Sequence, residues 1–426
     1  MMLAVLFISF VVLIFIKTPV AYAMGIASLL ALFVGGNSPV MVVTNMFSAV
    51  DSFPIMAIPF FILAGEMMNS GGITTRIVAF SRTIVGYIRG GLAHVNIVAS
   101  MFFAGISGSA TADASALGSM LIPVMVEDKY SPEFSVAVTA TSSTIGPIIP
   151  PSMMMIIYGV IANVSIADLF LAGIVPGVSV GLALMGMSYY ISVKHGYGAV
   201  CSLSLPDIGK SFLRAIIPLL MPLIILGGVL SGVFTATEAG VVATAYAFIV
   251  GKFIYKTLHF RDFPRIFINS AVMTSVCLFV IAQSSVFGRI LALEGFPYMI
   301  TSFLTSFDVS PVAIELMIVG FILFLGLFIE GIPVLIIFAP IFIPVISKIG
   351  LDLVHFGVVL NMAVLIGSVT PPVGILLYIC CNVAGIEVSK ASIIIWPFVA
   401  MMMLVLLFCL LFPSIVLFIS RSFSTV

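Results

Sequence analysis

Two adjacent-proline motifs interrupt apolar stretches of the chain where a helix would need backbone hydrogen bonds. The segment GPIIPPS contains Pro150-Pro151, and the segment TPPVG contains Pro371-Pro372. Proline has no N–H group, and inside a membrane the freed carbonyl oxygens need another partner. Carbonyl oxygens at one half-helix end suit a hard cation, and N–H groups at the other end suit a carboxylate. The two interruptions therefore predict ion binding close to the membrane midplane.

Glycines, hydroxyls and carbonyl-bearing residues flank both interruptions and define two expected cation sites. The first is expected to use Gly105, Ser107, Gly108, Ser109, Gly146 and Ile149, with the hydroxyl of Thr144 nearby. The second is expected to use Gly326, Ile329, Glu330, Gly367, Thr370 and Val373. The competing interpretation is close helix packing, since small residues let membrane helices approach one another.

Carboxylates lie in or beside the apolar runs at Asp113, Glu330, Glu66 and Glu238. A charge at the membrane centre costs on the order of 2.5–3.5 kcal/mol on insertion scales, so each is a functional hypothesis. Glu330 is expected to bind a cation or a proton, or to cap a helix, while Glu66 and Glu238 are more typical of interfaces. A substrate carboxylate is expected to meet polar residues of the first repeat, namely Ser107, Ser109, Asp113 and Ser143.

The elements that hold these residues belong to a membrane protein. Of 426 residues, 62% are hydrophobic and 8% are charged, whereas soluble domains carry about 25% charged residues. The formal net charge is zero, from 16 basic and 16 acidic residues, so no basic face for nucleic acid is expected. The sequence predicts an all-α polytopic protein. We expect its cysteines to be buried thiols, at Cys201, Cys277, Cys380, Cys381 and Cys409.

Apolar runs near the span length of roughly 20 residues occupy 1–16, 20–36, 54–68, 166–191, 215–232, 236–251, 266–289 and 391–420. The first run lacks a basic leader and is followed at once by another apolar run, so we expect a retained span, with a signal peptide as the alternative. Clusters of Lys and Arg near 76–89, 194–214 and 252–265 predict cytoplasmic loops. Arginines spaced among apolar residues in 74–89 are typical of an amphipathic helix at the interface, although an ordinary loop helix has the same pattern.

A single offset of 221 residues relates the two interruptions. It connects Pro123 to Pro344 (344 − 123) and Pro150 to Pro371 (371 − 150), and it also connects Gly105 to Gly326, Gly146 to Gly367 and His94 to Glu315. Five expected crossings separate the two copies, and an odd number inverts the second copy. Inverted repeats with broken helices are typical of secondary transporters.

Each copy is expected to contain a re-entrant helical hairpin, with its turn within 105–123 or 326–344, followed by a broken transmembrane helix. The expected division of the chain is 1–91 for scaffold helices and a cytoplasmic interfacial arm helix, 92–165 for the first transport repeat, 166–311 for scaffold helices and a second arm helix, 312–386 for the second transport repeat, and 387–426 for a C-terminal transmembrane helix.

The energy source is predicted from a missing motif and from electrostatics. The sequence has no G-x-x-x-x-G-K-[ST] loop, so ATP hydrolysis by this chain is not expected. Importing an anion against a negative-inside potential costs about 2.3 kcal/mol per charge per 100 mV. Entry of two or more sodium ions with the anion reverses that sign. Sodium is therefore the expected coupling ion and the only metal, and no organic cofactor is expected.

The motifs IPFFILAGEMM (58–68), GISGSATADASALGSMLIP (105–123), GPIIPPS (146–152) and TPPVG (370–374) occur in this order along the chain. In this the chain resembles the large membrane subunit of tripartite ATP-independent periplasmic (TRAP) transporters, over essentially its whole length. The resemblance implies a sodium-driven elevator in the bacterial inner membrane, with a small membrane subunit, which is not expected to be fused here, and a periplasmic substrate-binding protein as partners, and with membrane lipid around it. It implies carboxylate substrates such as C4-dicarboxylates or sialic acids.

Three other functions share parts of this pattern. An intramembrane protease would use Ser107 as a nucleophile, but it needs a histidine base at membrane depth. A channel would need a continuous pore in place of two opposed hairpins. The main alternative is another ion-coupled or proton-coupled anion transporter that works without a binding protein.

Overall fold

The computed structural model describes residues 1–16, 18–198, 205–305 and 310–423, and this part of the chain is helical without strands. Six helical stretches within it are long and apolar enough to cross a membrane, namely Phe53–Ser70, Ile166–His195, Ala236–Ile254, Phe263–Leu293, Gly331–Lys348 and Val388–Leu411. The predicted all-α polytopic class is confirmed. The predicted runs 1–16, 20–36 and 215–232 form shorter apolar helices.

The helices of the two repeats follow the 221-residue offset. The first set is α6 (Gly91–Ser107), α7 (Ala110–Glu127), α8 (Pro132–Ser142), the 3-10 turn η2 (Ser143–Ile145) and α9 (Met153–Ala162). The second set is α15 (Pro311–Gly326), α16 (Gly331–Lys348), α17 (Leu353–Val369) and α18 (Ile375–Ala384). Helices α7 and α16 begin and end 221 residues apart (331 − 110, 348 − 127), and so do the first residues of α8 and α17 (353 − 132).

The hairpin turns are shorter than the sequence indicated. In the first repeat, α6 continues to Ser107 and α7 resumes at Ala110. In the second repeat, the corresponding gap lies between Gly326 and Gly331. Ser109 accepts a hydrogen bond from the Ala112 N–H at 3.4 Å, which restarts the helix at once. Within each hairpin, the helix is therefore interrupted only at the tip.

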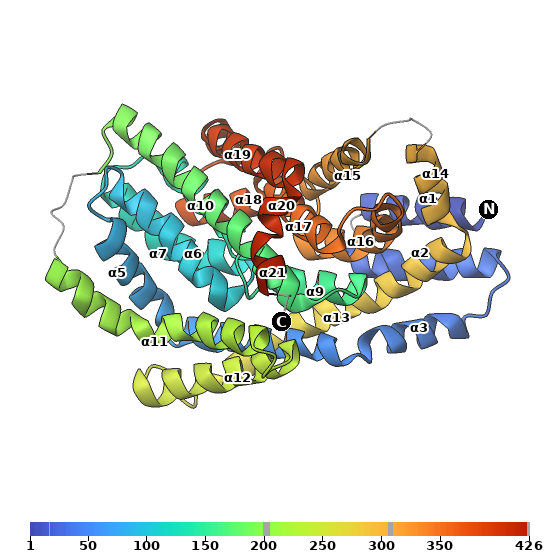
Figure 1. The fold of residues 1–426 in the computed structure, drawn as a ribbon, viewed down its shortest axis with the longest axis horizontal. Coiled ribbons are helices and arrows are strands. Elements are labelled where there is room, and N and C mark those ends of the chain that lie inside the picture. The colour runs from blue at the N-terminus through green and yellow to red at the C-terminus, as the bar shows by residue number, and fades with distance from the viewer. Residues whose placement is uncertain (17, 199–204, 306–309, 424–426) are drawn as a thin grey trace.

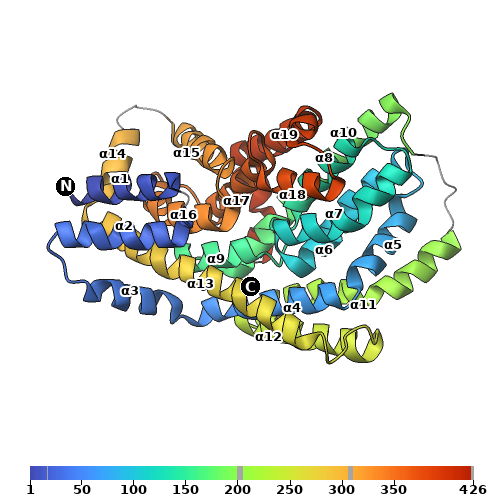
Figure 2. The same ribbon diagram turned by 180° about the vertical axis from the view of Figure 1, so that it is seen from behind.

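The second half of each broken helix packs against the hairpin of the other repeat. Helix α9 packs against α16 and α17, and α18 packs against α7 and α8. Figures 1 and 2 show the α6–α7 hairpin on one side of the bundle and the α15–α16 hairpin on the other, with α9, α17 and α18 between them. Neither repeat can bury its apolar surfaces without the other, so the two form one interlocked core.

The remaining helices surround this core. They are α1 (Met2–Phe15), α2 (Val20–Val34), α3 (Val40–Val50), η1 (Phe53–Met56), α4 (Ala57–Ser70), α5 (Ile73–Val85), α10 (Ile166–His195), α11 (Leu205–Leu230), α12 (Ala236–Ile249), the π-turn η3 (Val250–Ile254), α13 (Phe263–Leu293), α14 (Phe296–Thr305), α19 (Val388–Leu411), α20 (Pro413–Val416) and α21 (Phe418–Phe423). Helices α3, α11 and α12 run along one edge of the molecule (Figure 1).

Several boundaries differ from the sequence prediction. Helix α3 was not anticipated. The predicted run 391–420 is interrupted after Leu411, because Pro413 cannot continue the α19 hydrogen bonds. The stretch 74–89 contains helix α5, which ends at Val85 and leaves Arg89 outside; its place as an interfacial arm stays a prediction. The expected second arm corresponds to α14, and this assignment is likewise a prediction.

The cysteine prediction is confirmed where the structure describes these residues. Cys277, Cys380, Cys381 and Cys409 are buried free thiols, and Cys201 lies outside the described range. These side chains fill apolar helix contacts, as small hydrophobic residues do.

Candidate functional site

The tip of the first hairpin packs directly on the first broken segment. Gly108 ends α6 with φ +57°, a left-handed conformation that glycine adopts without a Cβ clash. A Cβ at Gly108 would lie 3.0 Å from the Pro151 carbonyl oxygen and 3.2 Å from the Met153 nitrogen. The sequence therefore needs glycine at this tip for both conformation and close approach.

The broken segment 146–152 is held by polar contacts from two sides. Gly146 leaves room for the carboxylate of Asp113, which is fully buried on α7. The Ser152 hydroxyl donates a hydrogen bond to the Pro147 carbonyl and accepts one from the Met155 N–H at 3.2 Å. From the second repeat, Asn361 Nδ2 donates to the same Pro147 carbonyl at 2.7 Å. These contacts replace backbone bonds that the prolines remove.

The second repeat brings Gly326 and Gly367 into direct contact. A Cβ at Gly367 would lie 2.7 Å from the Gly326 Cα atom and 2.8 Å from the Leu323 carbonyl oxygen. Thr370 ends α17, and its hydroxyl donates to the Ile366 carbonyl at 2.6 Å. Gly374 then starts α18 at φ +52°. The C-terminal ends of α15 and α17 therefore meet, as the predicted second cation site requires.

A small cavity of about 40 Å³, here called the inner cavity, lies between the two hairpin tips and both broken helices. It is lined by Gly108, Ser109, Ala110, Thr111, Pro147, Met154, Glu330, Gly331, Ile332, Leu365, Ser368, Ile375 and Leu376. Helices that flank both interruptions therefore border one space.

First-turn residues of four helices line the inner cavity. They come from α7 (Ala110, Thr111), α9 (Met154), α16 (Gly331, Ile332) and α18 (Ile375, Leu376). The first N–H groups of a helix have no partner within that helix, and its N-terminus carries about half a positive charge. No Lys, Arg or His is among the lining residues. Any positive partial charge at this cavity therefore comes from the backbone.

A second cavity of about 110 Å³, here called the outer cavity, lies between the hairpin tips and two of the surrounding helices. Ser109, Thr111, Glu330 and Ile332 line both cavities. The opposite wall of the outer cavity comes from α4 and α13, with Ile62, Gly65, Glu66, Asn69, Met273 and Cys277. The tips thus form a thin partition between the two spaces.

The carboxylates that lie in or beside the apolar runs have different surroundings. Glu330 precedes α16 without capping it through its side chain, and it keeps an exposed surface toward both cavities. Glu66 accepts a hydrogen bond from Asn269 at 2.9 Å. Glu238 forms a capping box with Thr235 at the start of α12 and is exposed. Its position is explained by helix capping alone.

The predicted site residues are only partly gathered at the cavities. Gly108, Ser109 and Glu330 line them, while Gly146, Gly326, Gly367 and Thr370 lie in the helix ends behind. Ile149 is half-buried and Val373 is exposed. Asp113 and Ser143 are not among the lining residues, and Ser143 and Thr144 donate within their own turn, to Ala140 and Thr141. Gly105 and Ser107 lie at the end of α6, and the Ser107 side chain is outside the described part.

Sequence reasoning missed Asn361. Its side chain is 1% exposed, and Oδ1 has no hydrogen-bond partner while Nδ2 holds the first broken segment. Asn361, Leu365 and Ser368 share one face of α17, because they are spaced by four and three residues. A lone amide in the apolar stretch 353–369 was the available signal, since polar groups in membrane helices are rare.

Comparison with known proteins identifies the family. Residues 7–415 match the family model described as tripartite ATP-independent periplasmic transporter, DctM component. The chain is 39% identical over 96% of both chains to the sialic acid TRAP transporter large permease protein SiaM of Vibrio cholerae. It is 38% identical to the sialic acid TRAP transporter permease protein SiaT of Haemophilus influenzae, over 96% of this chain and 66% of SiaT. It is 34% identical to the C4-dicarboxylate permease DctM of Pseudomonas aeruginosa, over 87% of each chain.

The fold has solved counterparts as well. MtrF of Neisseria gonorrhoeae, described as one of a class of antimetabolite efflux pumps, superimposes with a TM-score of 0.63 at 12% identity, over 88% of this chain and 84% of MtrF. At that identity the likeness concerns the fold alone. The sequence relatives are transporter permeases of the inner membrane and not enzymes, which confirms the predicted class and localisation. The chain belongs to the DctM family of large permease subunits of tripartite ATP-independent periplasmic transporters.

Proposed function

We propose that this chain imports an acidic organic solute together with sodium. The solute is a sialic acid such as N-acetylneuraminate, or a C4-dicarboxylate, as in the proteins named above. The observation that carries the proposal is the convergence of four helix N-termini on a cavity without basic side chains. Half-helix N-termini that point at an anionic substrate group are a known solution in membrane transporters.

The cations are assigned to the opposite helix ends. Gly105, Gly108, Gly146, Gly326, Gly367 and Thr370 lie at or close to the C-terminal ends of α6, η2, α15 and α17. Those ends carry carbonyl oxygens and about half a negative charge each. Glu330 adds a carboxylate beside the inner cavity. A bound sodium ion would offset the repulsion between Glu330 and a substrate carboxylate, which couples the two solutes.

Movement of the interlocked core against the surrounding helices is the proposed mechanism. The reciprocal contacts of α9 with α16 and of α18 with α7 are what two copies related by a two-fold axis would make, and they support the inverted-repeat interpretation. They also join the two repeats into one body. The outer cavity lies between the tips of that body and helices α4 and α13, and this is where sliding would occur in an elevator mechanism.

Delivery of the solute is assigned to a periplasmic substrate-binding protein, and a small membrane subunit is proposed to complete the complex. The word tripartite in the family description supports both partners. The alternative is a transporter that takes its solute directly from solution. The two differ in whether uptake needs the binding protein.

The test is uptake by proteoliposomes that contain this chain with the small membrane subunit. Labelled N-acetylneuraminate is supplied with and without the binding protein, under an inward sodium gradient and an inside-negative potential. We expect saturable uptake that needs sodium and the binding protein, and competition by unlabelled solutes identifies the substrate class. Uptake driven by a pH gradient alone, with no effect of sodium, would refute the coupling ion.

A cross-link tests the sliding motion. Asn69 of α4 and Thr111 of the first tip line opposite walls of the outer cavity. The experiment is done in a Cys277→Ala background, because the free thiol of Cys277 lines the same cavity. In the Asn69→Cys/Thr111→Cys protein of this background, a bifunctional thiol reagent should stop uptake, and each single cysteine variant should continue to transport after the same treatment. Full uptake by the cross-linked protein would contradict movement at this surface.

A further inference from the structure

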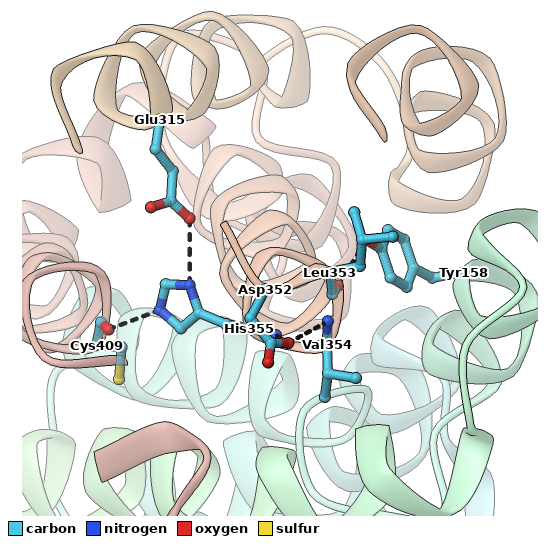
Figure 3. A network of polar contacts seen from close by, with 7 residues as sticks. All are labelled: Tyr158, Glu315, Asp352, Leu353, Val354, His355 and Cys409. Atoms are coloured by element: carbon cyan, nitrogen blue, oxygen red, sulfur yellow. Dashed lines mark hydrogen bonds and ion pairs between the residues drawn. The ribbon is translucent and has the colours of Figure 1, made fainter. Parts of the chain in front are cut away.

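The second repeat contains a buried acid–base pair that lies apart from both cavities. Glu315 of α15 and His355 of α17 face each other, with Oε1 and Nδ1 3.4 Å apart and both side chains 1% exposed. On its other side the imidazole Nε2 lies 3.0 Å from the Cys409 carbonyl oxygen of α19. Figure 3 shows the ring between these two partners. One histidine therefore joins three helices.

The geometry defines how many protons the pair holds. A carbonyl oxygen only accepts, so Nε2 carries a hydrogen toward Cys409. Nδ1 then faces a carboxyl group, and neither Glu315 oxygen has a hydrogen-bond partner within the distance and angle of a good bond. Without a further proton, the Nδ1 lone pair would oppose a buried carboxylate. One shared proton between Nδ1 and Oε1 removes that conflict, whether it is written as imidazolium with carboxylate or as imidazole with carboxylic acid.

Other titratable groups around the pair occupy a different layer. Asp352 caps the start of α17 by accepting from the Val354 and His355 N–H groups, and it lies 3.6 Å from Arg421. The Tyr158 hydroxyl of α9 donates to the Leu353 carbonyl at 2.8 Å. From α19, the Cys409 thiol is also buried beside the ring. Asp352 and Arg421 keep 39% and 66% of their side-chain surface exposed, so solvent screens them from the pair.

The first repeat has no such pair. The positions 221 residues earlier are His94 (315 − 221) and Phe134 (355 − 221). Phe134 is buried in apolar packing, and His94 bonds the Arg89 carbonyl at 3.2 Å. An aromatic side chain therefore suffices at the position of His355 in the same architecture. The pair is a feature that one repeat has and the other does without.

We propose that Glu315 and His355 form a binding site for one proton, and that this proton fastens α15 to α17 and α19. Loss of the proton from Nδ1 to water leaves a buried carboxylate that faces a lone pair, which drives α15 away from α17. Uptake of a second proton leaves a buried cation without a counter-charge. Both changes lower the stability of the folded protein, because each leaves an unpaired charge buried away from water. The contact between α15 and α17 therefore weakens both above and below the pH range in which the pair holds one proton.

The consequence reaches the predicted cation site. Helices α15 and α17 are the ones that meet at Gly326 and Gly367. Separation of these helices near Glu315 and His355 alters the angle at which their other ends touch. Proton binding here would therefore regulate uptake without touching sodium or solute.

The test compares pH profiles of thermal stability for the purified chain in lipid nanodiscs. For the natural protein we expect an apparent melting temperature that falls at both acid and alkaline pH. The alkaline fall lies between the pKa of histidine in the unfolded chain and that of the folded pair, because there the folded protein still holds the proton that the unfolded chain has lost. Glu315→Gln cannot ionise, yet it keeps the shape and can donate to Nδ1, so it should lose the alkaline fall and keep the acid fall. A Glu315→Gln variant with the natural alkaline fall would overturn the proposal.

Two further variants complete the comparison. The double variant Glu315→Leu/His355→Phe removes both titratable groups, places at 355 the phenylalanine that the first repeat has at 134, and should lose both falls. Asp352→Asn is the matched control, because it changes the neighbouring carboxylate and leaves the pair; it should keep both falls. If the alkaline fall disappears in Asp352→Asn, the proton site is Asp352 and the proposal fails.

A direct measurement does not depend on any variant's stability. The chain has four histidines, so ¹⁵N-histidine labelling gives few ring signals, and Glu315→Gln identifies His355 by its shift. We expect the Nδ1 signal of His355 to change at the upper end of the alkaline fall in melting temperature, because loss of the shared proton removes the hydrogen bond at Nδ1 in either description. An Nδ1 signal that stays unchanged there would overturn the proposal.

Discussion

The contact between Gly326 and Gly367 gives the sharpest prediction, which is the effect of Gly367→Ala. The added Cβ would lie 2.7 Å from the Gly326 Cα atom, 2.8 Å from the Leu323 carbonyl oxygen and 2.9 Å from the Gly326 carbonyl carbon. Carbon atoms pack best at about 3.5–4.0 Å, so α15 and α17 must separate by several tenths of an ångström. All three neighbours are backbone atoms, which cannot rotate away.

The magnitude follows from two opposing effects. Overpacking a tight contact costs about 1–3 kcal/mol, and the rigid backbone neighbours place this site toward the upper end. Replacing glycine by alanine within a helix recovers about 1 kcal/mol. Gly320→Ala on α15 is the matched control, since a Cβ there has no neighbour within 4 Å. The two variants should therefore differ in stability by about 2–3 kcal/mol.

The assays are thermal unfolding in lipid and sodium-dependent uptake. Gly367→Ala should lower the melting temperature and raise the sodium concentration for half-maximal uptake, because the helix ends assigned to the second cation site are displaced. Gly320→Ala should leave the sodium dependence unchanged. Equal behaviour of the two variants would refute the close helix contact and its link to sodium.

Three other substitutions test single contacts. Asn361→Leu removes the bond from α17 to the Pro147 carbonyl, so we expect a loss of about 1–3 kcal/mol in unfolding free energy and slower uptake, measured by thermal unfolding and initial rates. Glu330→Gln removes the carboxylate between the cavities, so sodium titrations of uptake should show weaker sodium dependence. Tyr158→Phe deletes the bond to the Leu353 carbonyl and should lower stability by about 0.5–1.5 kcal/mol, measured by thermal unfolding.

Each of these has a matched control on the exposed surface. Asn382 and Tyr378 are exposed on α18, and Glu238 is an exposed helix cap. Asn382→Leu, Tyr378→Phe and Glu238→Gln should therefore leave uptake and its sodium dependence as in the natural protein. If Glu238→Gln weakens sodium dependence as much as Glu330→Gln does, the effect is one of general surface charge and Glu330 has no special role.

The helix breaks and the duplication could be predicted because they depend on residue type and spacing. Proline and glycine change backbone geometry wherever they occur, so Pro150, Pro371 and their offset were informative without any structure. Helix ends were harder. Ser109 restarts α7 within two residues of the end of α6, and such capping depends on one local hydrogen bond that hydropathy does not detect.

It was harder still to predict which polar residues take part in the site. Asn361 lies 214 positions along the chain from Pro147 (361 − 147), yet the two share a hydrogen bond. Ser143 has the right chemistry for a substrate contact, but its hydroxyl bonds within its own turn. Hydroxyl and amide groups are equally polar in a sequence. Only their rotamers and neighbours decide which of them reach a cavity.

The sequence by itself determined the class of this protein, the positions of its interruptions and its family, because composition and breaker residues act locally and the motifs occur in order. The tertiary structure alone decided that α9 crosses to the second hairpin and α18 to the first, that four helix N-termini meet at one cavity, and that Glu315 opposes His355. These are contacts between segments far apart in the chain. Their partners are chosen by how apolar helix faces pack, which no local pattern of residues records.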